Sequence, residues 1–178
     1  MKVLAMIFDG FEELEATAPF ALLRRAGIEL TIVSNRTEVI GAHNLHFTDI
    51  YLINEVNYRD YDALLIPGGP HYRFLGNFGY ALEIIQYFCE TKKIVAAICA
   101  APTILGQLGC LRGRKYTCFT CMDGDFGGTY VDVPVVVDNN LITARSAAAS
   151  IDFAYEIIRK LVGNDALLAL KKRIYDEK

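Results

Sequence analysis

Blocks of apolar residues recur along the chain, and four of them are short and rich in aliphatic side chains. They cover residues 3–8, 28–33, 62–66 and 94–98. Short apolar runs of this kind are typical of parallel strands that are buried on both faces of a sheet. Two further runs, residues 131–137 and 141–144, flank Asp138-Asn139-Asn140 and predict a β-hairpin.

Between these runs the apolar residues return at helical spacing. A first helix is predicted after Gly10, with a kink or a restart at Pro19 and an end at Gly27. Further helices are predicted over residues 79–91, 101–109 and 146–163, and beyond Asn164. Alternating strands and helices favour an α/β fold, a three-layer α/β/α sandwich around a mostly parallel sheet. We expect residues 1–178 to form a single domain, because this length is typical of one.

The charge pattern excludes several classes of partner. The formal net charge is −3 and the Lys and Arg residues are scattered, so we expect no nucleic-acid partner. The apolar run at residues 3–8 is too short to span a bilayer, and acidic residues follow it where a signal peptide would have its cleavage site. These features predict no membrane association and a cytoplasmic protein.

The cysteine content indicates free thiols. The number is odd and no secretion signal precedes the five residues, which are Cys89, Cys99, Cys110, Cys118 and Cys121. Cys118 and Cys121 have C-x-x-C spacing, but without a second such pair this is weak evidence for zinc or a thioredoxin-like site. A redox partnership of either one with Cys99 stays open. The chain lacks both G-x-G-x-x-G and G-x-x-x-x-G-K-[ST], so we expect no nucleotide, and we expect no metal or other cofactor.

Cys99 lies where a strand is predicted to turn directly into a helix. Ala97 and Ala101 supply the small flanking residues that a nucleophile elbow needs, and Pro102 suits the first helical turn. The N-terminus of a helix lowers the pKa of a nearby thiol, so the sequence predicts a reactive thiolate at Cys99. The alternative is a buried core cysteine without chemistry.

Two other loops are expected to meet Cys99, because the carboxyl ends of parallel strands share one edge of the sheet. Glu15, after the first strand, is placed to press its carboxyl group against the thiol. Shielding from water would raise its pKa and let it donate a hydrogen bond to the sulfur. The other acidic residues of the segment, Glu12 and Glu13, are expected only to complement the helix dipole.

The loop after the third strand contains a Gly-Gly pair. Backbone N–H groups at Gly68 and Gly69, together with that of Ala100, are candidates for an oxyanion hole. The alternative is an ordinary tight turn. His71 follows in the same loop and is expected to be a solvated loop residue.

These motifs together resemble the ThiJ/PfpI family, in particular its deglycase-like branch. The resemblance covers residues 2–163 and rests on the segments Asp9–Glu15, Arg24–Gly27, Leu65–Gly69, Ala96–Thr103 and Leu141–Arg145. It implies a flavodoxin-like fold and a homodimer. It also implies that Cys99 is an oxidation-prone nucleophile, that Glu15 is its protonated partner, and that Gly69 and Ala100 hold the oxyanion side.

Three functions follow as hypotheses. The first is an enzyme that acts on small reactive aldehydes such as methylglyoxal, or on their protein adducts, as a glyoxalase III or a protein deglycase. The second is a redox sensor or redox-responsive chaperone, in which Cys99 oxidises to sulfinic acid without turnover. The third is a dimeric structural protein with an inert Cys99.

The sequence departs from the family pattern at Ala101 and at Ala147-Ala148-Ala149, where the family usually carries glycine-containing segments, and at two positions that bear on the chemistry. Ala100 stands where the protease-like branch carries a His directly after the cysteine, so we expect no peptidase activity. Phe119 stands where some deglycase-like members carry a His near the nucleophile. The chain therefore has no evident second proton carrier at this position.

Overall fold

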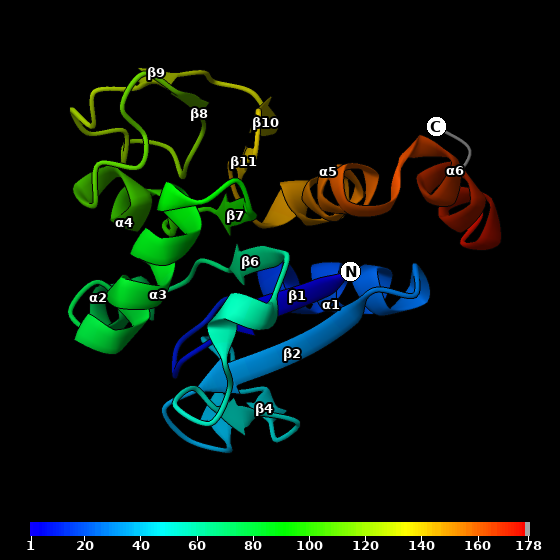
Figure 1. Cartoon of the computed structure of the whole chain (residues 1–178), viewed down its shortest axis with the longest axis horizontal. Helices are drawn as coiled ribbons and strands as arrows, with labels where there is room; N and C mark the ends of the chain where they lie inside the picture. The colour runs from blue at the N-terminus through cyan, green and yellow to red at the C-terminus, as the bar shows by residue number, and fades with distance from the viewer. Residues whose placement is uncertain (177–178) are drawn as a thin grey trace.

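A seven-stranded sheet runs through the centre of the computed structural model, which describes residues 1–176 (Figure 1). The strand order is β10-β11-β7-β6-β1-β2-β5, and every pairing is parallel except that of β10 with β11. The strands are β1 (Lys2–Met6), β2 (Glu29–Ser34), β5 (Tyr51–Leu52), β6 (Ala63–Ile66), β7 (Ile94–Ile98), β10 (Val135–Asp138) and β11 (Leu141–Ala144). The four buried strands and the hairpin predicted from the sequence are all present.

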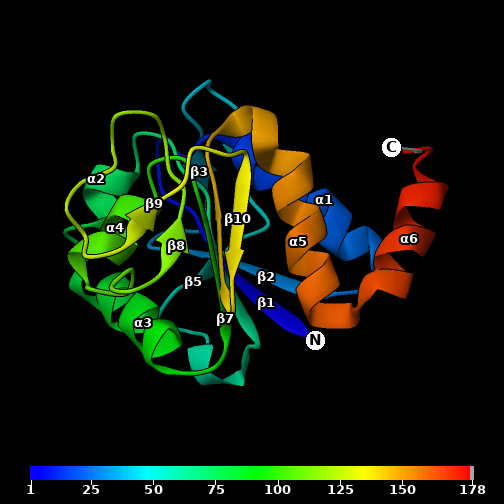
Figure 2. The ribbon, with the colours of Figure 1, turned by 90° about the horizontal axis from the view of Figure 1, so that it is seen from above.

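Helices cover both faces of this sheet, as Figure 2 shows edge-on. One face carries α1 (Glu13–Arg25), α5 (Ser150–Val162) and α6 (Asn164–Arg173). The other carries α2 (Tyr72–Leu75), α3 (Gly79–Glu90) and α4 (Pro102–Gln107). Short 3-10 turns lie at η1 (Tyr58–Asp60) and at η2 (Ala147–Ala149), which precedes α5. The predicted three-layer α/β/α sandwich is confirmed.

The first strand shows why the sequence folds into three layers. Its side chains alternate between the two cores: Val3 and Ala5 pack with α1 and α5, whereas Leu4 and Met6 pack with α3 and α4. Successive side chains of a strand point to opposite faces, so a strand covered on both sides needs apolar residues at every position. This requirement explains the unbroken apolar run.

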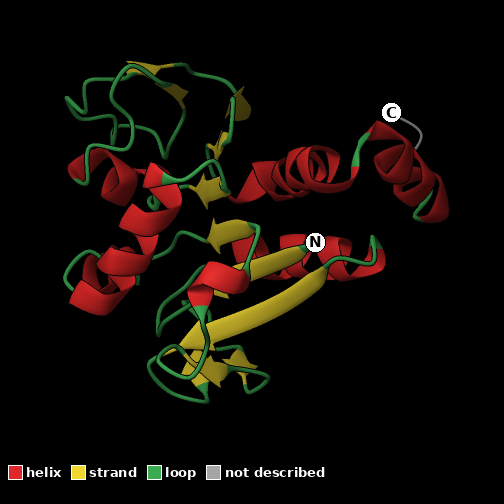
Figure 3. Cartoon of the chain, viewed as in Figure 1, coloured by secondary structure: helices red, strands yellow, loops and turns green. Residues whose placement is uncertain are grey.

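Loops with short strands extend from the main sheet (Figure 3). β3 (Val39–Ile40) pairs with β4 (His46–Phe47), and β8 (Lys115–Tyr116) pairs with β9 (Thr129–Tyr130). The segment between β8 and β9 contains Phe119, whose backbone N–H donates to the Cys99 carbonyl across 2.7 Å. This contact brings the segment to the carboxyl end of β7.

The first helix is continuous. α1 runs through Pro19 to Arg25 without a second start, so of the two alternatives predicted at Pro19, a kink or a restart, the restart is wrong. A proline within a helix removes one N–H donor, and here the packing of α1 against α5 and the sheet outweighs that loss. The predicted stop is confirmed, since Gly27 follows the helix with a positive φ of 76°.

Two cysteines form a disulfide, which corrects the prediction that all five are free thiols. Cys89, near the end of α3, bonds to Cys110, just after α4, with a Cα–Cα distance of 5.7 Å. The free thiols are those of Cys99, Cys118 and Cys121. The sequence did not reveal the pair because the two residues meet only when α3 and α4 pack on the same face of the sheet. Within residues 1–176, no helix is both long and apolar enough to cross a bilayer.

Candidate active site

The elbow at Cys99 is as tight as the sequence predicts. β7 ends at Ile98, α4 begins at Pro102, and Cys99 itself adopts a left-handed conformation with φ of 64°. Residues with a side chain rarely adopt this conformation, and it concentrates at functional sites because the surrounding structure must stabilise it. Here the Cys99 N–H donates to the Ala144 carbonyl across 2.9 Å, which fixes the turn to the neighbouring strand.

Glu15 reaches the elbow from α1. Its side chain is 1% exposed, and its Oε2 accepts a 2.9 Å hydrogen bond from the Gly68 N–H. Burial raises the pKa of Glu15 to about 7, although hydrogen bonds from Cys99 and Gly68 oppose this shift. The structure therefore brings together the thiol and the carboxyl group that the sequence places on separate loops.

The Cys99 thiol does not have the lowered pKa that the sequence predicts. The pKa of Cys99 is raised to about 12 by burial, by the negative charge of Glu15 and by the hydrogen bond between the two side chains. Hydrogen bonds from the N–H groups of Ala100 and Gly69 lower it, but by less. The helix dipole expected to favour the thiolate comes from α4, which has only six residues. Buried together, Cys99 and Glu15 retain at least one proton between them at neutral pH.

The Gly-Gly loop must approach this pair closely. A Cβ atom on Gly68 would lie 2.6 Å from both the Cys99 Cβ and the Glu15 Oε2. Gly69 has a φ of +95°, and a Cβ there would lie 2.4 Å from the Glu12 backbone N. Both positions therefore need glycine, which leaves the Gly69 N–H facing the sulfur beside that of Ala100.

His71 holds this loop from within, although the sequence suggested a solvated residue. It is 1% exposed, its Nε2 lies 2.8 Å from the Pro67 carbonyl, and its Nδ1 lies 3.3 Å from the Phe8 N–H. A neutral ring satisfies both contacts by donating from Nε2 and accepting at Nδ1. Burial lowers the pKa of His71 to about 4. The sequence prediction is wrong because His71 is bonded to the segment that follows β1, through Phe8 and Gly10, as well as to its own loop through Pro67.

Glu13 also has a role beyond the helix dipole. Its buried Oε1 accepts hydrogen bonds from the N–H groups of His43, at 2.7 Å, and Leu45, at 3.4 Å. The side chains of Glu12, Glu13 and His43 bring possible metal-ligand atoms within 4.8 Å of one another, and the His43 Nε2 lies 3.1 Å from Glu12 Oε2. The contacts of Glu13 explain it as the anchor of the loop between β3 and β4.

A pocket of about 230 Å³ lies beside the elbow and is lined in part by Cys99. Its other lining residues come from the loop after β6 with α2, from the elbow after β7 and from the segment after β8; they are Gly69, Pro70, Tyr72, Arg73, Ala100, Phe119 and Met122. Sequence reasoning missed Tyr72, Arg73 and Met122, because nothing in their spacing relates them to Cys99. Cys121 is exposed, whereas Cys118 is buried and burial raises its pKa to about 12.

Comparison with known proteins identifies relatives across nearly the whole chain. The model of the DJ-1/PfpI family matches residues 1–160. The chain is 30% identical to Protein DJ-1 homolog B of Arabidopsis thaliana over 176 residues, which cover 96% of this chain but only 40% of that longer protein. It is 34% identical over 149 residues to a protein of Thermococcus kodakarensis that is named a deglycase, covering 82% of this chain and 90% of the relative.

Solved structures agree with this relationship. The DJ-1beta structure of Drosophila melanogaster superposes with a TM-score of 0.91 at 27% identity, and covers 99% of this chain and 98% of its own. The oxidised DJ-1 of Toxoplasma gondii also gives a TM-score of 0.91, at 25% identity, with 99% of each chain covered. The three-layer fold built around Cys99 is thus the fold of these proteins.

Proposed function

Since the chain belongs to the DJ-1/PfpI family, we propose that it is a cysteine-dependent enzyme that acts on small α-oxoaldehydes or on their protein adducts. The observation that carries the proposal is the pairing of a thiol at a strained elbow with a buried carboxyl group whose pKa is about 7. A group that titrates near the working pH is suited to move a proton in either direction. The relative named a deglycase supports the same substrate class.

The first step is addition of the thiol to the aldehyde carbon. The sulfur–carbon bond forms as the carbonyl π bond breaks, and Glu15 accepts the proton that the Cys99 thiol releases. The N–H groups of Gly69 and Ala100 then stabilise the oxyanion of the resulting hemithioacetal. No charged side chain is needed at position 119 for this step.

The remaining steps redistribute hydrogen within the substrate. A proton leaves the former aldehyde carbon and another joins the neighbouring ketone carbon, so the first carbon is oxidised to a thioester and the second is reduced to an alcohol. Water then cleaves the thioester, which frees Cys99 and releases a 2-hydroxy acid. The net reaction adds one water molecule to the oxoaldehyde and gives the 2-hydroxy acid, so no external oxidant takes part. Glu15 is the group within reach of Cys99 that carries the protons.

The test is lactate formation from methylglyoxal by the wild type and by Cys99→Ala and Glu15→Gln. We expect Cys99→Ala to abolish turnover and Glu15→Gln to lower kcat by about a hundredfold or more, as loss of a general acid–base group does. Cys121→Ala is the matched control, because it removes an exposed free thiol. Equal rates in all four proteins would exclude this function.

A second candidate is a redox sensor in which Cys99 oxidises to sulfinic acid. Cys99 is partly exposed, and the N–H groups of Gly69 and Ala100 that face the sulfur are suited to binding sulfinate oxygens. After peroxide treatment, mass spectrometry should find two added oxygens at Cys99 before Cys118 or Cys121 is modified. Uniform oxidation of the three free thiols would contradict this role.

We further propose that the protein is cytoplasmic, and that the chain forms a homodimer, as the family resemblance implies. Leu14 on α1 and Ile151 on α5 are each 51% exposed despite being apolar, and the two helices pack side by side. Burial of such residues favours association. Light scattering should give twice the chain mass of 19.8 kDa, and Leu14→Glu with Ile151→Glu should give the monomer.

A further inference from the structure

The pocket beside Cys99 is built to hold an apolar group. Pro70 and Tyr72, from the loop after β6 and from α2, line it together with Cys99 and with Phe119 and Met122 from the segment after β8. Its volume of about 230 Å³ is far larger than a methyl substituent needs. A small substrate such as methylglyoxal would leave most of these apolar surfaces in contact with water.

A backbone hydrogen bond holds the segment after β8 next to the elbow. The Phe119 N–H donates to the Cys99 carbonyl across 2.7 Å, so the residue that carries this ring is bonded directly to the elbow residue. Its side chain is 46% exposed and packs into neither of the two cores, as expected of a residue that contributes to a binding surface.

Arg73 contributes the one charged side chain among the residues that line this pocket. Its guanidinium lies 5.7 Å from the centre of the Tyr72 ring, and its Nε lies 3.5 Å from the Tyr72 hydroxyl. A cation at this position favours neutral or anionic substrates and opposes those that carry a positive charge. Substrates with an ammonium or guanidinium group near the reacting carbonyl are therefore disfavoured.

We propose that the substrates are α-oxoaldehydes with a bulky, uncharged apolar substituent, such as an aryl or branched alkyl glyoxal, and that Phe119 determines this specificity. The inference rests on the proposed function, because it assigns the group that occupies the pocket when the aldehyde carbon bonds to Cys99. Each additional apolar carbon that is buried in such a pocket strengthens binding, and a single methylene is worth about tenfold or more.

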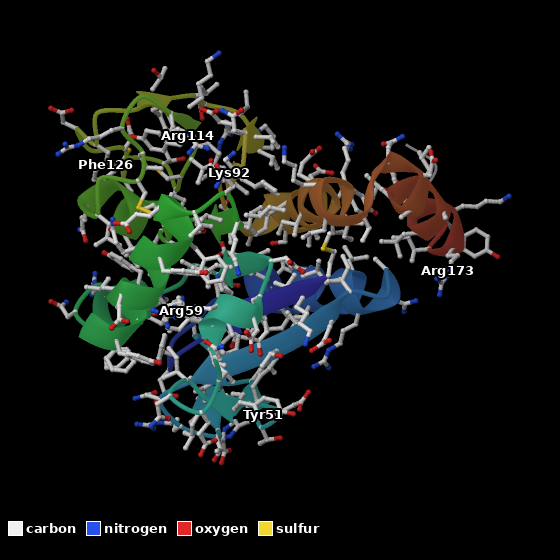
Figure 4. All side chains as sticks on the ribbon, viewed as in Figure 1. Tyr51, Arg59, Lys92, Arg114, Phe126 and Arg173 are labelled. Carbon is white, nitrogen blue, oxygen red and sulfur yellow. A yellow bond between two sulfur atoms is a disulfide. The ribbon has the colours of Figure 1, made fainter. Side chains whose placement is uncertain are left out.

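The experiment compares initial rates for phenylglyoxal, which gives mandelate, with those for methylglyoxal, which gives lactate. We expect kcat/KM to be at least about tenfold higher for phenylglyoxal, chiefly through a lower KM. Phe119→Ala should bring the ratio of the two kcat/KM values to within about threefold of one, and Phe119→Leu should restore most of it. Tyr51→Ala is the control, since it truncates an aromatic ring that is 57% exposed on the edge strand β5, far from Phe126 and the segment after β8 (Figure 4).

The outcomes separate the two proposals. If neither substrate is converted, the proposed function fails. If methylglyoxal is converted as well as phenylglyoxal or better, the proposed enzymatic function is retained and the specificity inference is overturned. A preference for phenylglyoxal that survives in Phe119→Ala with an unchanged KM would overturn the role of this residue. Thermal unfolding of each variant shows whether a lost activity reflects the pocket or the fold.

Discussion

The backbone N–H of Gly68 donates a 2.9 Å hydrogen bond to Oε2 of Glu15, a residue 53 positions earlier in the chain. This bond joins the loop after β6 to α1 immediately beside the Cys99 thiol. It is possible only because position 68 has no side chain, since a Cβ there would lie 2.6 Å from both the Cys99 Cβ and the Glu15 Oε2. The glycine therefore sets the distance between the thiol and its carboxyl partner.

Gly68→Ala should displace Glu15 from Cys99. Overpacking of a buried site costs about 1–3 kcal/mol of stability, and we expect oxoaldehyde turnover to fall by about a hundredfold because the proton acceptor moves. Urea unfolding and kinetic assays measure the two effects. Gly79→Ala is the control: it begins α3, has nothing within 4 Å of its added Cβ, and should leave turnover unchanged without lowering stability. Wild-type turnover in Gly68→Ala would refute the spacing argument.

Glu15→Gln should lower the pKa of Cys99. The carboxylate raises that pKa through its negative charge and its hydrogen bond, and a neutral amide removes the charge. The variant should therefore react with iodoacetamide at Cys99 at lower pH than the wild type, even though its turnover is reduced. Mass spectrometry of the Cys99 peptide across pH gives the titration. Glu55→Gln, at an exposed residue, is the control. An unchanged or higher pKa would mean that Glu15 holds its proton and donates to the sulfur.

Glu15 and His71 should make opposite contributions to stability between pH 4.5 and 6.5. The pKa of Glu15 rises on folding from 4.5 to about 7, so its contribution is complete below pH 4.5 and is lost as pH rises through 7. The pKa of His71 falls from 6.5 to about 4, so its contribution is complete above pH 6.5 and is lost as pH falls through 4. In the wild type the two effects cancel over this range.

Single substitutions separate these contributions. In Glu15→Gln the free energy of unfolding should increase with pH over this window, because only the His71 effect remains. In His71→Asn it should decrease with pH, at a slope approaching about 1.4 kcal/mol per pH unit. Urea unfolding at pH 4.5, 5.5 and 6.5 gives the slopes. Slopes of the same sign in both variants would contradict the assignment of a buried, neutral His71.

Reduction of the Cys89–Cys110 disulfide should destabilise the fold. The bond closes a loop with a sequence separation of 21, and constraining a loop of this size contributes about 3 kcal/mol. Thiol titration of the denatured protein should find three free thiols without reductant and five after it. Cys89→Ser should lower the unfolding midpoint as reduction does, and Cys121→Ser should not. Five thiols before reduction would exclude the bond in the isolated protein.

The pattern of residues along the chain is sufficient to identify the layers of the fold and the elbow. Residues 94–98 are apolar at every position, and this identifies β7 because a strand with helices on both faces has no position left for polar side chains. Small residues around Cys99 likewise identify a tight turn, which has φ of 64° in the structure. Both inferences depend on neighbouring residues in the chain, so local patterns were sufficient for them.

The pKa of the reactive thiol, the burial of His71 and the disulfide follow from the packed fold. The pKa of Cys99 depends on the burial of the thiol and on Glu15, which lies on another element, so a local helix-dipole argument gave the wrong direction. His71 is a buried loop anchor and Cys89 bonds to Cys110. Both depend on contacts between segments whose positions in the sequence do not indicate that they are neighbours. Desolvation and charge interactions depend on distance in space rather than on separation along the chain, and the packing of the whole sandwich sets those distances.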